Sequence, residues 1–311
     1  MTDDTGIDIV TGAFSYSGNA IAAALLADGR EVRTVTGHPG RAQPESPIQV
    51  RALAFDDPAE LVTAMSGAST LYNTYWVRFA RGGIDHRLAE DNSRILFEAA
   101  REAGIARIVH VSITNPSIDS PFPYFRGKAR VEQMLAETGV SHAILRPAIL
   151  FGGNDVLVNN IAWLLRHLPV FGVGGRGDYR IRGIHVDDLA ALCLAHGRER
   201  ANVVVDAVGP ERPTFLELVE AIRAAVGSWS RIVHVPGAAV PILARTLGLV
   251  LRDVLLTPDE YRAMADGLAD SDAPTSGSTA ISAWLSENGA KLGRRYANEL
   301  GRHFTTTGTA R

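Results

Sequence analysis

Short apolar, β-branched runs alternate with helical patterns along the first half of the chain. Strands are predicted at Ile7–Thr11, Glu31–Val35, Ile48–Phe55, Thr70–Thr74, Arg107–Val111 and His142–Leu145. Helices are predicted between them at Asn19–Asp28, Pro58–Met65, His86–Glu102 and Tyr124–Glu137. A repeat of strand, helix and strand is typical of a parallel sheet with crossover helices. We therefore predict an α/β domain of the Rossmann type, a doubly wound parallel sheet, in residues 1–150.

The second half of the chain has a different pattern, in which helices predominate. Helices are predicted at Val156–His167, Asp187–Ala195, Thr214–Val226, Pro258–Gly267 and Glu287–His303, and short strands at Val203–Val205 and Ile232–Val235. The glycine-rich run at residues 172–180 follows no strong strand pattern, so we expect a mobile connection there. Residues 151–311 are thus predicted to form a smaller, mostly helical substrate lobe.

Composition narrows the kinds of partner to be expected. The formal net charge is −3 and the pI is near 6.3, whereas nucleic acid or an anionic membrane normally calls for a basic face. The apolar stretch at residues 238–251 is interrupted by Pro241 and Arg245 and is too short to span a bilayer. With one cysteine and no zinc-ligand spacing among the nine histidines, no metal site is predicted. We expect a soluble, cytoplasmic protein that binds a small molecule, with no nucleic acid or membrane partner.

The turn after the first predicted strand carries the pattern of a pyrophosphate-binding loop. It reads Thr11-Gly12-Ala13-Phe14-Ser15-Tyr16-Ser17-Gly18, and a helix pattern follows directly. Such a turn needs small residues for close backbone approach and free amides at a helix start that face the anion. Ser15 stands where the three-glycine form of this pattern has its middle glycine. We expect Gly12, Phe14, Ser15, Tyr16 and Gly18 to contact a nicotinamide dinucleotide, with a purely structural turn as the alternative.

Residues after the next strands bear on which dinucleotide is bound. No acid follows the second strand to bind the adenosine ribose of NAD, whereas Thr36, His38 and Arg41 are suited to the 2′-phosphate of NADP. We therefore expect NADP(H) to be favoured over NAD(H), although an arginine after a strand is often simply solvated. Asp56 lies where the adenine amino group is expected. Asn73 and Tyr75, at the end of the fourth strand, are expected beside the cofactor.

Tyr124 and Lys128 lie four residues apart on one predicted helix and therefore on the same face. A nearby ammonium favours the phenolate and lowers the pKa of a tyrosine from about 10, which suits a general acid or base. Ser112 or Thr114, after the fifth strand, could orient a carbonyl or alcohol of the substrate. The spacing leaves open which hydroxyl does so, and an ordinary surface pair is the alternative for Tyr124 and Lys128.

These motifs together resemble the short-chain dehydrogenase/reductase superfamily. The resemblance is to its atypical and extended branches, which include NAD-dependent epimerase/dehydratase, NmrA-like and complex I accessory-subunit-like proteins. It rests on the glycine loop, Phe55-Asp56-Asp57, the Tyr124/Lys128 pair and two blocks at residues 145–152 and 184–190. It implies that Tyr124 is the acid/base and that Lys128 binds the nicotinamide ribose. The sequence blocks further imply that Val111 and Pro147 lie beside the nicotinamide and that a segment near residues 181–207 returns to the Rossmann domain.

The resemblance implies an NAD(P)-dependent oxidoreductase, or an epimerase or dehydratase, that moves a hydride to or from a carbonyl or secondary alcohol. A homodimer with paired helices would be unsurprising in this superfamily. The family often has two adjacent hydroxyl residues after the fifth strand, whereas Ile113 separates Ser112 from Thr114 here. This departure and the altered glycine pattern favour an alternative, a non-catalytic NADP(H)-binding redox sensor or scaffold subunit.

Overall fold

The computed structural model describes residues 6–78 and 85–298, and the chain divides into two units. The first unit comprises Met1–Pro147 and Val186–Ala207, and the second comprises Ala148–His185 and Val208–Arg311. The chain therefore leaves the first unit after Pro147 and returns to it for one helix and one strand.

The first unit is built on a sheet of seven parallel strands. Their bounds are β1 (Ile7–Thr11), β2 (Glu31–Thr36), β3 (Gln49–Ala52), β4 (Ala68–Asn73), β5 (Arg107–Val111), β6 (Ser141–Pro147) and β10 (Val203–Ala207). They pair in the order β10-β6-β5-β4-β1-β2-β3, and all neighbours are parallel. Central strands are covered on both faces, so Ile9, Leu71 and Ile108 are fully buried. This burial explains why these strands have nearly continuous apolar sequences.

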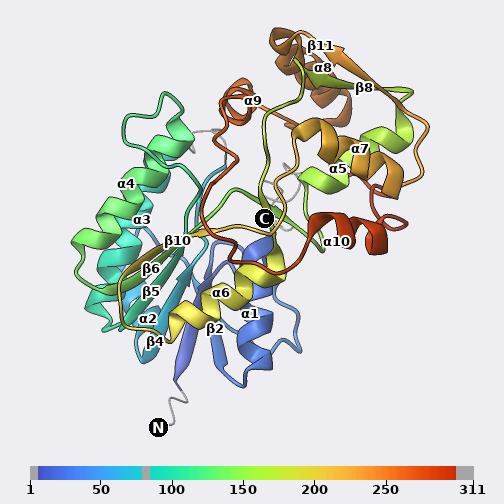
Figure 1. The fold of residues 1–311 in the computed structure, drawn as a ribbon. Coiled ribbons are helices and arrows are strands. Elements are labelled where there is room, and N and C mark those ends of the chain that lie inside the picture. The colour runs from blue at the N-terminus through green and yellow to red at the C-terminus, as the bar shows by residue number, and fades with distance from the viewer. Residues whose placement is uncertain (1–5, 79–84, 299–311) are drawn as a thin grey trace, which may run out of the picture. The chain divides into compact units, whose positions relative to one another are not determined.

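Helices cover both faces of the sheet. On one face, α1 (Tyr16–Ala27) and α6 (Val186–Gly197) pack against each other, and on the other α2 (Pro58–Met65), α3 (His86–Glu102) and α4 (Pro123–Glu137) form a row (Figure 1). This arrangement confirms the predicted doubly wound α/β fold.

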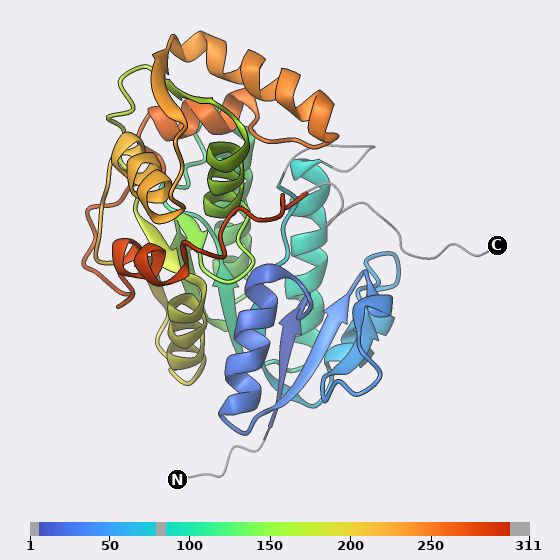
Figure 2. The same cartoon turned by 90° about the vertical axis from the view of Figure 1, so that its right-hand side faces the viewer.

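The strand order reverses at β1, because β2 and β3 lie on one side of it and β4, β5 and β6 on the other. In open parallel sheets, ligands bind outside the carboxyl ends of the strands at such a reversal. Figure 2 shows β1, in dark blue, ending beside the first turn of α1. The fold thus marks the β1–α1 turn and the end of β4 as the place for a ligand.

The second unit combines two small parallel strand pairs with five helices in its described part. β7 (Ile149–Phe151) pairs with β9 (Gly183–His185), and β8 (Val170–Gly174) pairs with β11 (Arg231–Val235). The helices are α5 (Leu157–His167), α7 (Phe215–Ala225), α8 (Val240–Leu251), α9 (Pro258–Ala265) and α10 (Ile281–Asn288). Its core buries Phe151, Val158 and Ile222 completely.

Two predictions about the second unit are wrong. Residues 172–174 of the expected glycine-rich connection are instead the end of β8, in which Phe171 and Val173 are buried. The helix expected at Glu287–His303 is instead α10, which ends at Asn288. Gly289 packs so tightly that a Cβ there would lie 2.3 Å from Ala225 O, and Gly293 has a φ of +65°, so the helical path is broken. Residues 299–303 of that expected helix lie outside the described part of the chain.

Among the described residues, none of the helices has the length and apolar content needed to cross a bilayer. Within residues 6–78 and 85–298, His, Cys, Asp and Glu side chains form no group of three that could hold a metal ion.

Candidate functional site

The β1–α1 loop has the geometry of an anion-binding turn. Gly12 has a φ of +62°, and its amide donates to Val35 O at 3.0 Å. Its carbonyl accepts from the Ser15 amide at 2.8 Å, which closes the turn. A Cβ at Gly18 would lie 2.3 Å from Gly12 O, so only glycine permits this approach of α1 to the loop.

Ser15 fits the loop without strain, because its φ of −88° is open to any residue. It is the N-cap of α1, but its side chain makes no capping hydrogen bond, and the first turn of α1 contains no acidic residue. The amides of that turn and the positive end of the helix dipole therefore suit a phosphate. Phe14 and Tyr16 flank Ser15 and are each half-buried. The residues present fit a dinucleotide, and the substitution of the middle glycine does not impair the turn.

Thr36 is the last residue of β2, and His38 and Arg41 follow it along the chain. The His38 amide donates to Thr36 Oγ1 at 3.1 Å, and Pro39–Arg41 forms a short 3-10 helix. Burial, followed by the nearby Arg41 cation, lowers the pKa of His38. After β3, Asp57 caps α2 by accepting from the Glu60 amide. The neighbouring Asp56 is exposed.

A buried polar network lies beneath the ends of β1, β4 and β5. Asn73 Oδ1 accepts from Thr11 Oγ1 at 3.1 Å and from the Tyr75 amide at 3.0 Å, and Asn73 Nδ2 lies 3.0 Å from His110 Nδ1. Both ends of the Asn73 side-chain amide are therefore engaged within the protein, and they hold the ends of β1, β4 and β5 together. Tyr75 Oη accepts from Asn92 Nδ2 at 2.8 Å. His110, which the sequence analysis did not single out, is fully buried, and burial followed by the Lys128 charge holds its pKa well below the usual value.

Lys128 is buried at the carboxyl end of β5. Its Nζ donates to Val111 O at 3.0 Å and lies 4.7 Å from the centre of the Trp76 ring. Burial lowers the pKa of Lys128 to about 7, and Glu132 opposes that shift. Lysine side chains are almost never fully buried unless they are paired, because burial disfavours the charged amine.

The two hydroxyl candidates after β5 differ in their surroundings. Ser112 is 4% exposed, and its Oγ has no hydrogen-bond partner among the described residues. Its amide donates to Leu145 O, while the Thr114 amide donates to Pro147 O at the end of β6. Both residues are therefore fixed beside β6. An unpaired buried hydroxyl is costly in a folded protein. A hydrogen bond from Ser112 Oγ to a bound ligand would remove that cost.

Aromatic side chains enclose Tyr124, which is half-buried near the start of α4. Its ring centre lies 5.8 Å from Trp76 and 5.7 Å from His86, edge-on to both. Gly127 makes room for Trp76, since a Cβ there would lie 2.9 Å from the indole. No sequence signal indicated His86, because its place at the start of α3 is explained equally well by helix formation.

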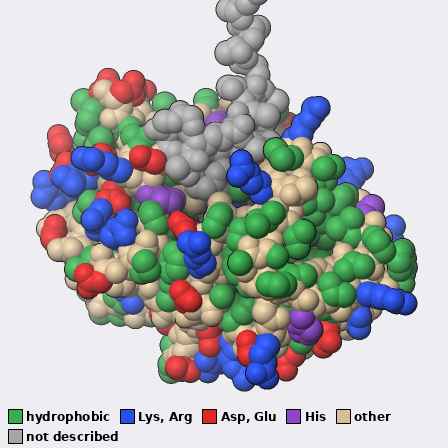
Figure 3. Space-filling model, turned by 90° about the horizontal axis from the view of Figure 1, so that it is seen from above, with side chains coloured by type: hydrophobic (Ala, Val, Ile, Leu, Met, Phe, Trp, Pro, Cys, Tyr) green, Lys and Arg blue, Asp and Glu red, His purple; other side chains and the backbone are tan. Residues whose placement is uncertain are grey.

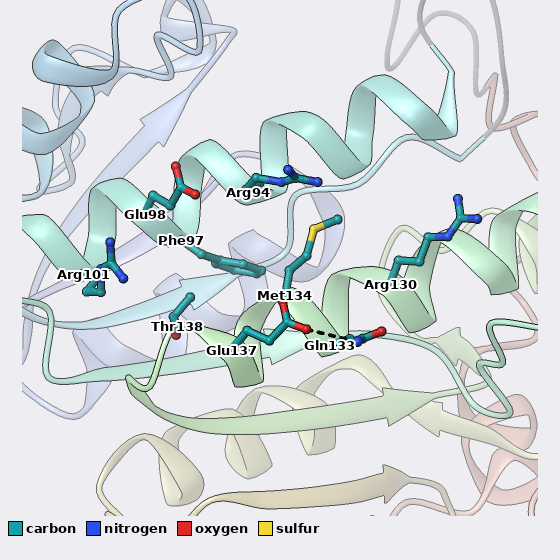
Figure 4. Close-up of a pocket in the computed structure, with 9 residues that line it drawn as sticks. All are labelled: Arg94, Phe97, Glu98, Arg101, Arg130, Gln133, Met134, Glu137 and Thr138. Carbon is teal, nitrogen blue, oxygen red and sulfur yellow. Dashed lines mark hydrogen bonds between the residues drawn. The ribbon is translucent and has the colours of Figure 1, made fainter.

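A separate groove of about 430 Å³ lies between α3 and α4 (Figure 4). Its lining is largely charged or polar and includes Arg94, Glu98, Arg130 and Glu137. It follows the C-terminal halves of the two helices, whereas Tyr124 lies at the N-terminal end of α4. This groove is therefore distinct from the loop and the Tyr124/Lys128 pair.

Comparison with known sequences identifies the nucleotide-binding part. Residues 12–161 match a family described as NAD(P)H-binding. The chain is 31% identical over 221 residues to an uncharacterized protein of Mycobacterium tuberculosis, a match that covers 68% of this chain but only 23% of that protein. It is 27% identical over 249 residues to a ceramide reductase of Caulobacter vibrioides, covering 77% of this chain and 76% of the reductase.

A solved structure extends the comparison to nearly the whole chain. The triphenylmethane reductase of a Citrobacter species, complexed with NADP(H), matches with a TM-score of 0.74 at 20% identity, covering 91% of this chain and 99% of that one. At this identity the likeness shows the fold. The matches confirm the resemblance to the atypical and extended branch of the short-chain dehydrogenase/reductase superfamily. The chain carries an NAD(P)H-binding domain and has a reductase-like fold.

Proposed function

We propose that this protein is an NADP(H)-dependent oxidoreductase that reduces a ketone or aldehyde to an alcohol, or catalyses the reverse reaction. The observation that carries the proposal is the enclosed Lys128 ammonium, 3.0 Å from Val111 O at the end of β5 and one turn along α4 from Tyr124. A fold that only had to pack would not enclose this charge, because burial disfavours the protonated amine.

Each residue has a distinct role in the proposed reduction. The bound cofactor supplies the hydride, and Tyr124 Oη donates a proton to the substrate's carbonyl oxygen. Lys128 favours the phenolate that remains and binds the ribose hydroxyls. Ser112 Oγ, rather than Thr114, donates a hydrogen bond that orients the carbonyl. The support for Ser112 is its buried hydroxyl without a partner in the described structure.

Cofactor binding in this proposal requires Trp76 to move. Its indole lies over Lys128 Nζ at 4.7 Å, and Lys128 is 3% exposed. The ribose hydroxyls reach the ammonium only after the indole has shifted. Gly12, Phe14, Ser15, Tyr16 and Gly18 would then surround the pyrophosphate, with Val111 and Pro147 beside the nicotinamide.

We assign the preference for NADP(H) to the groups after β2. Thr36, His38 and Arg41 would bind the 2′-phosphate, and the Arg41 cation beside His38 supports this role. Asp56 is assigned to the adenine amino group. Asn73 and Tyr75 act on the cofactor indirectly, since hydrogen bonds to Thr11 and Asn92 hold them in place.

The experiment is a screen for NADPH oxidation with ketones and aldehydes. Long-chain, lipid-like carbonyl compounds come first, because the Caulobacter relative is named a ceramide reductase. Tyr124→Phe should lower kcat by about 100-fold or more, the usual contribution of a general acid, while NADPH affinity changes less than about twofold. Tyr179→Phe, which alters a tyrosine of the second unit, is the matched control.

Two results would contradict the proposal. Unchanged turnover in Tyr124→Phe would remove Tyr124 from the reaction. Tight NADPH binding by the unaltered protein without turnover of any carbonyl compound would favour a redox sensor or scaffold subunit.

A further inference from the structure

The second unit exposes an unusually apolar surface formed by α8, β8 and β11. Six of its side chains have exposed fractions from 38% to 76%; they are Val170, Val233, Ile242, Leu243, Leu249 and Val250. We call these residues the α8 face. In Figure 3, hydrophobic side chains gather on the part of the surface formed by these elements, which lie at the upper right of Figure 1. Monomeric proteins rarely expose contiguous apolar patches without a partner.

The packing of α8 leaves its apolar side chains outside. A Cβ at Gly174 would lie 2.7 Å from Val240, and one at Gly172 would lie 4.0 Å from Leu243, so the start of α8 rests on β8. Along the helix only Gly248 is fully buried. Ile242, Leu249 and Val250 recur at helical spacing and are 67%, 75% and 76% exposed. The helix therefore turns an apolar stripe toward solvent.

The charged side chains on the three elements of the α8 face are all positive. No aspartate or glutamate occurs in α8, β8 or β11, whereas Arg231 begins β11, Arg245 lies within α8 and Arg252 follows it. All three arginines are exposed. Of the nearest acids along the chain, Asp253 is buried and accepts from Tyr296 Oη at 2.7 Å, and Asp259 lies 3.9 Å from Arg262.

We propose that the α8 face binds the surface of an anionic phospholipid bilayer. Its leucine, isoleucine and valine side chains enter the boundary between headgroups and acyl chains, while the arginines contact lipid phosphates. A helix of 12 residues is about 18 Å long, so it lies in the interface and does not span the roughly 30 Å core. The net charge of −3 led us to expect no membrane partner. A net charge does not report a local group of arginines such as this one.

The positive charge of the α8 face also argues against a second copy of the chain as its binding partner. In a two-fold interface the same patch meets itself, so arginines would approach arginines without acidic partners on these elements. A bilayer that contains phosphatidylglycerol supplies the missing negative charge. This inference does not depend on the proposed redox chemistry.

The test is cosedimentation of the full chain with vesicles. We expect the protein to bind vesicles of phosphatidylcholine with 30% phosphatidylglycerol, about tenfold more tightly than phosphatidylcholine alone, and to be released by salt. Leu249→Glu combined with Val250→Glu should reduce binding at least tenfold, and Arg245→Glu should reduce it by about fivefold or more. Ile118→Glu, which alters an exposed isoleucine of the first unit, should leave binding unchanged.

Three outcomes would overturn the proposal. The first is no binding to anionic vesicles, and the second is equal binding by the Leu249→Glu/Val250→Glu variant. The third is found by sedimentation velocity without lipid: a dimer that this double variant dissociates would show that the face joins two copies. Circular dichroism confirms that each variant is folded before it is tested.

Discussion

The two units depart from ordinary burial in opposite ways. The first unit encloses polar groups that normally stay in water: Lys128 is 3% exposed, and His110 and Asn73 are fully buried. The second unit leaves Leu249 and Val250, which normally lie inside, about three-quarters exposed. Each departure costs free energy of folding, the first through lost hydration of a charge and the second through apolar surface left in water.

This difference in burial indicates which kind of partner each unit is suited to bind. Buried polar groups at the carboxyl ends of β1, β4 and β5 suit a small, polar cofactor that enters a preorganised site. An exposed apolar stripe on α8 suits an extended apolar partner, for which no pocket is required. Neither feature follows from packing alone, since apolar residues at Lys128 and polar residues at Leu249 would give the more stable fold.

The largest expected effect is on stability, in Lys128→Met. Burial lowers the pKa of Lys128 from 10.5 to about 7, so between these pH values the unfolded chain binds more protons and stability rises with pH. Below pH 7 the folded protein carries the full cost of the buried ammonium, and at pH 7 it still carries most of it. Lys128→Met should therefore raise the free energy of unfolding by about 4 kcal/mol at pH 7, and this gain should vanish above pH 10.5.

Urea denaturation of both proteins across this pH range measures the effect. Lys291→Met changes an exposed lysine and is the control. A gain in Lys128→Met that does not change between pH 7 and pH 10.5 would mean that the ammonium is not enclosed as described.

A smaller effect is expected at Arg41. If its cation binds the 2′-phosphate, Arg41→Ala should weaken NADPH binding about tenfold, or about 1.4 kcal/mol, and leave NADH binding unchanged. Calorimetric titration with both nucleotides measures this, and Arg51→Ala, an exposed arginine of β3, is the comparison. Equal losses for NADPH and NADH would remove the assigned role.

The smallest effect is expected on the α8 face. Leu249→Ser should change the free energy of unfolding by less than about 0.5 kcal/mol, because the leucine is 75% exposed. Leu285→Ser, at a buried leucine of the same unit, should cost several times more. A large loss in Leu249→Ser, measured by denaturation without lipid, would show that this side chain is covered in solution.

The first unit was predictable because its strands are buried on both faces and its helices end at glycines. The prediction located β1 and β5 at their observed bounds, and Tyr124 and Lys128 lie on α4 as the spacing required. The prediction at Ile48–Phe55 was too long, since β3 is an edge strand limited to Gln49–Ala52.

In the second unit the sequence predicted α5, α7 and β11 close to their observed bounds but did not predict β8 or α8. Glycines at two of the five positions of β8 hid that strand, and α8 is apolar on nearly every side, so its sequence shows no buried stripe. In the site, sequence spacing indicated Tyr124 and Lys128 but not the enclosure of Lys128 by Trp76. That contact joins α4 to the segment after β4 and depends on tertiary structure.

The most direct test of the central claim is calorimetric titration of NADPH into Gly18→Ala. The new Cβ would meet Gly12 O at 2.3 Å, whereas Gly172→Ala makes only ordinary contacts at 3.6 Å or more. We predict that the unaltered protein binds one NADPH per chain, that Gly18→Ala weakens binding at least about 100-fold, and that Gly172→Ala leaves it unchanged. Equal binding by Gly18→Ala, or no binding by the unaltered protein, would contradict a dinucleotide site at the β1–α1 loop.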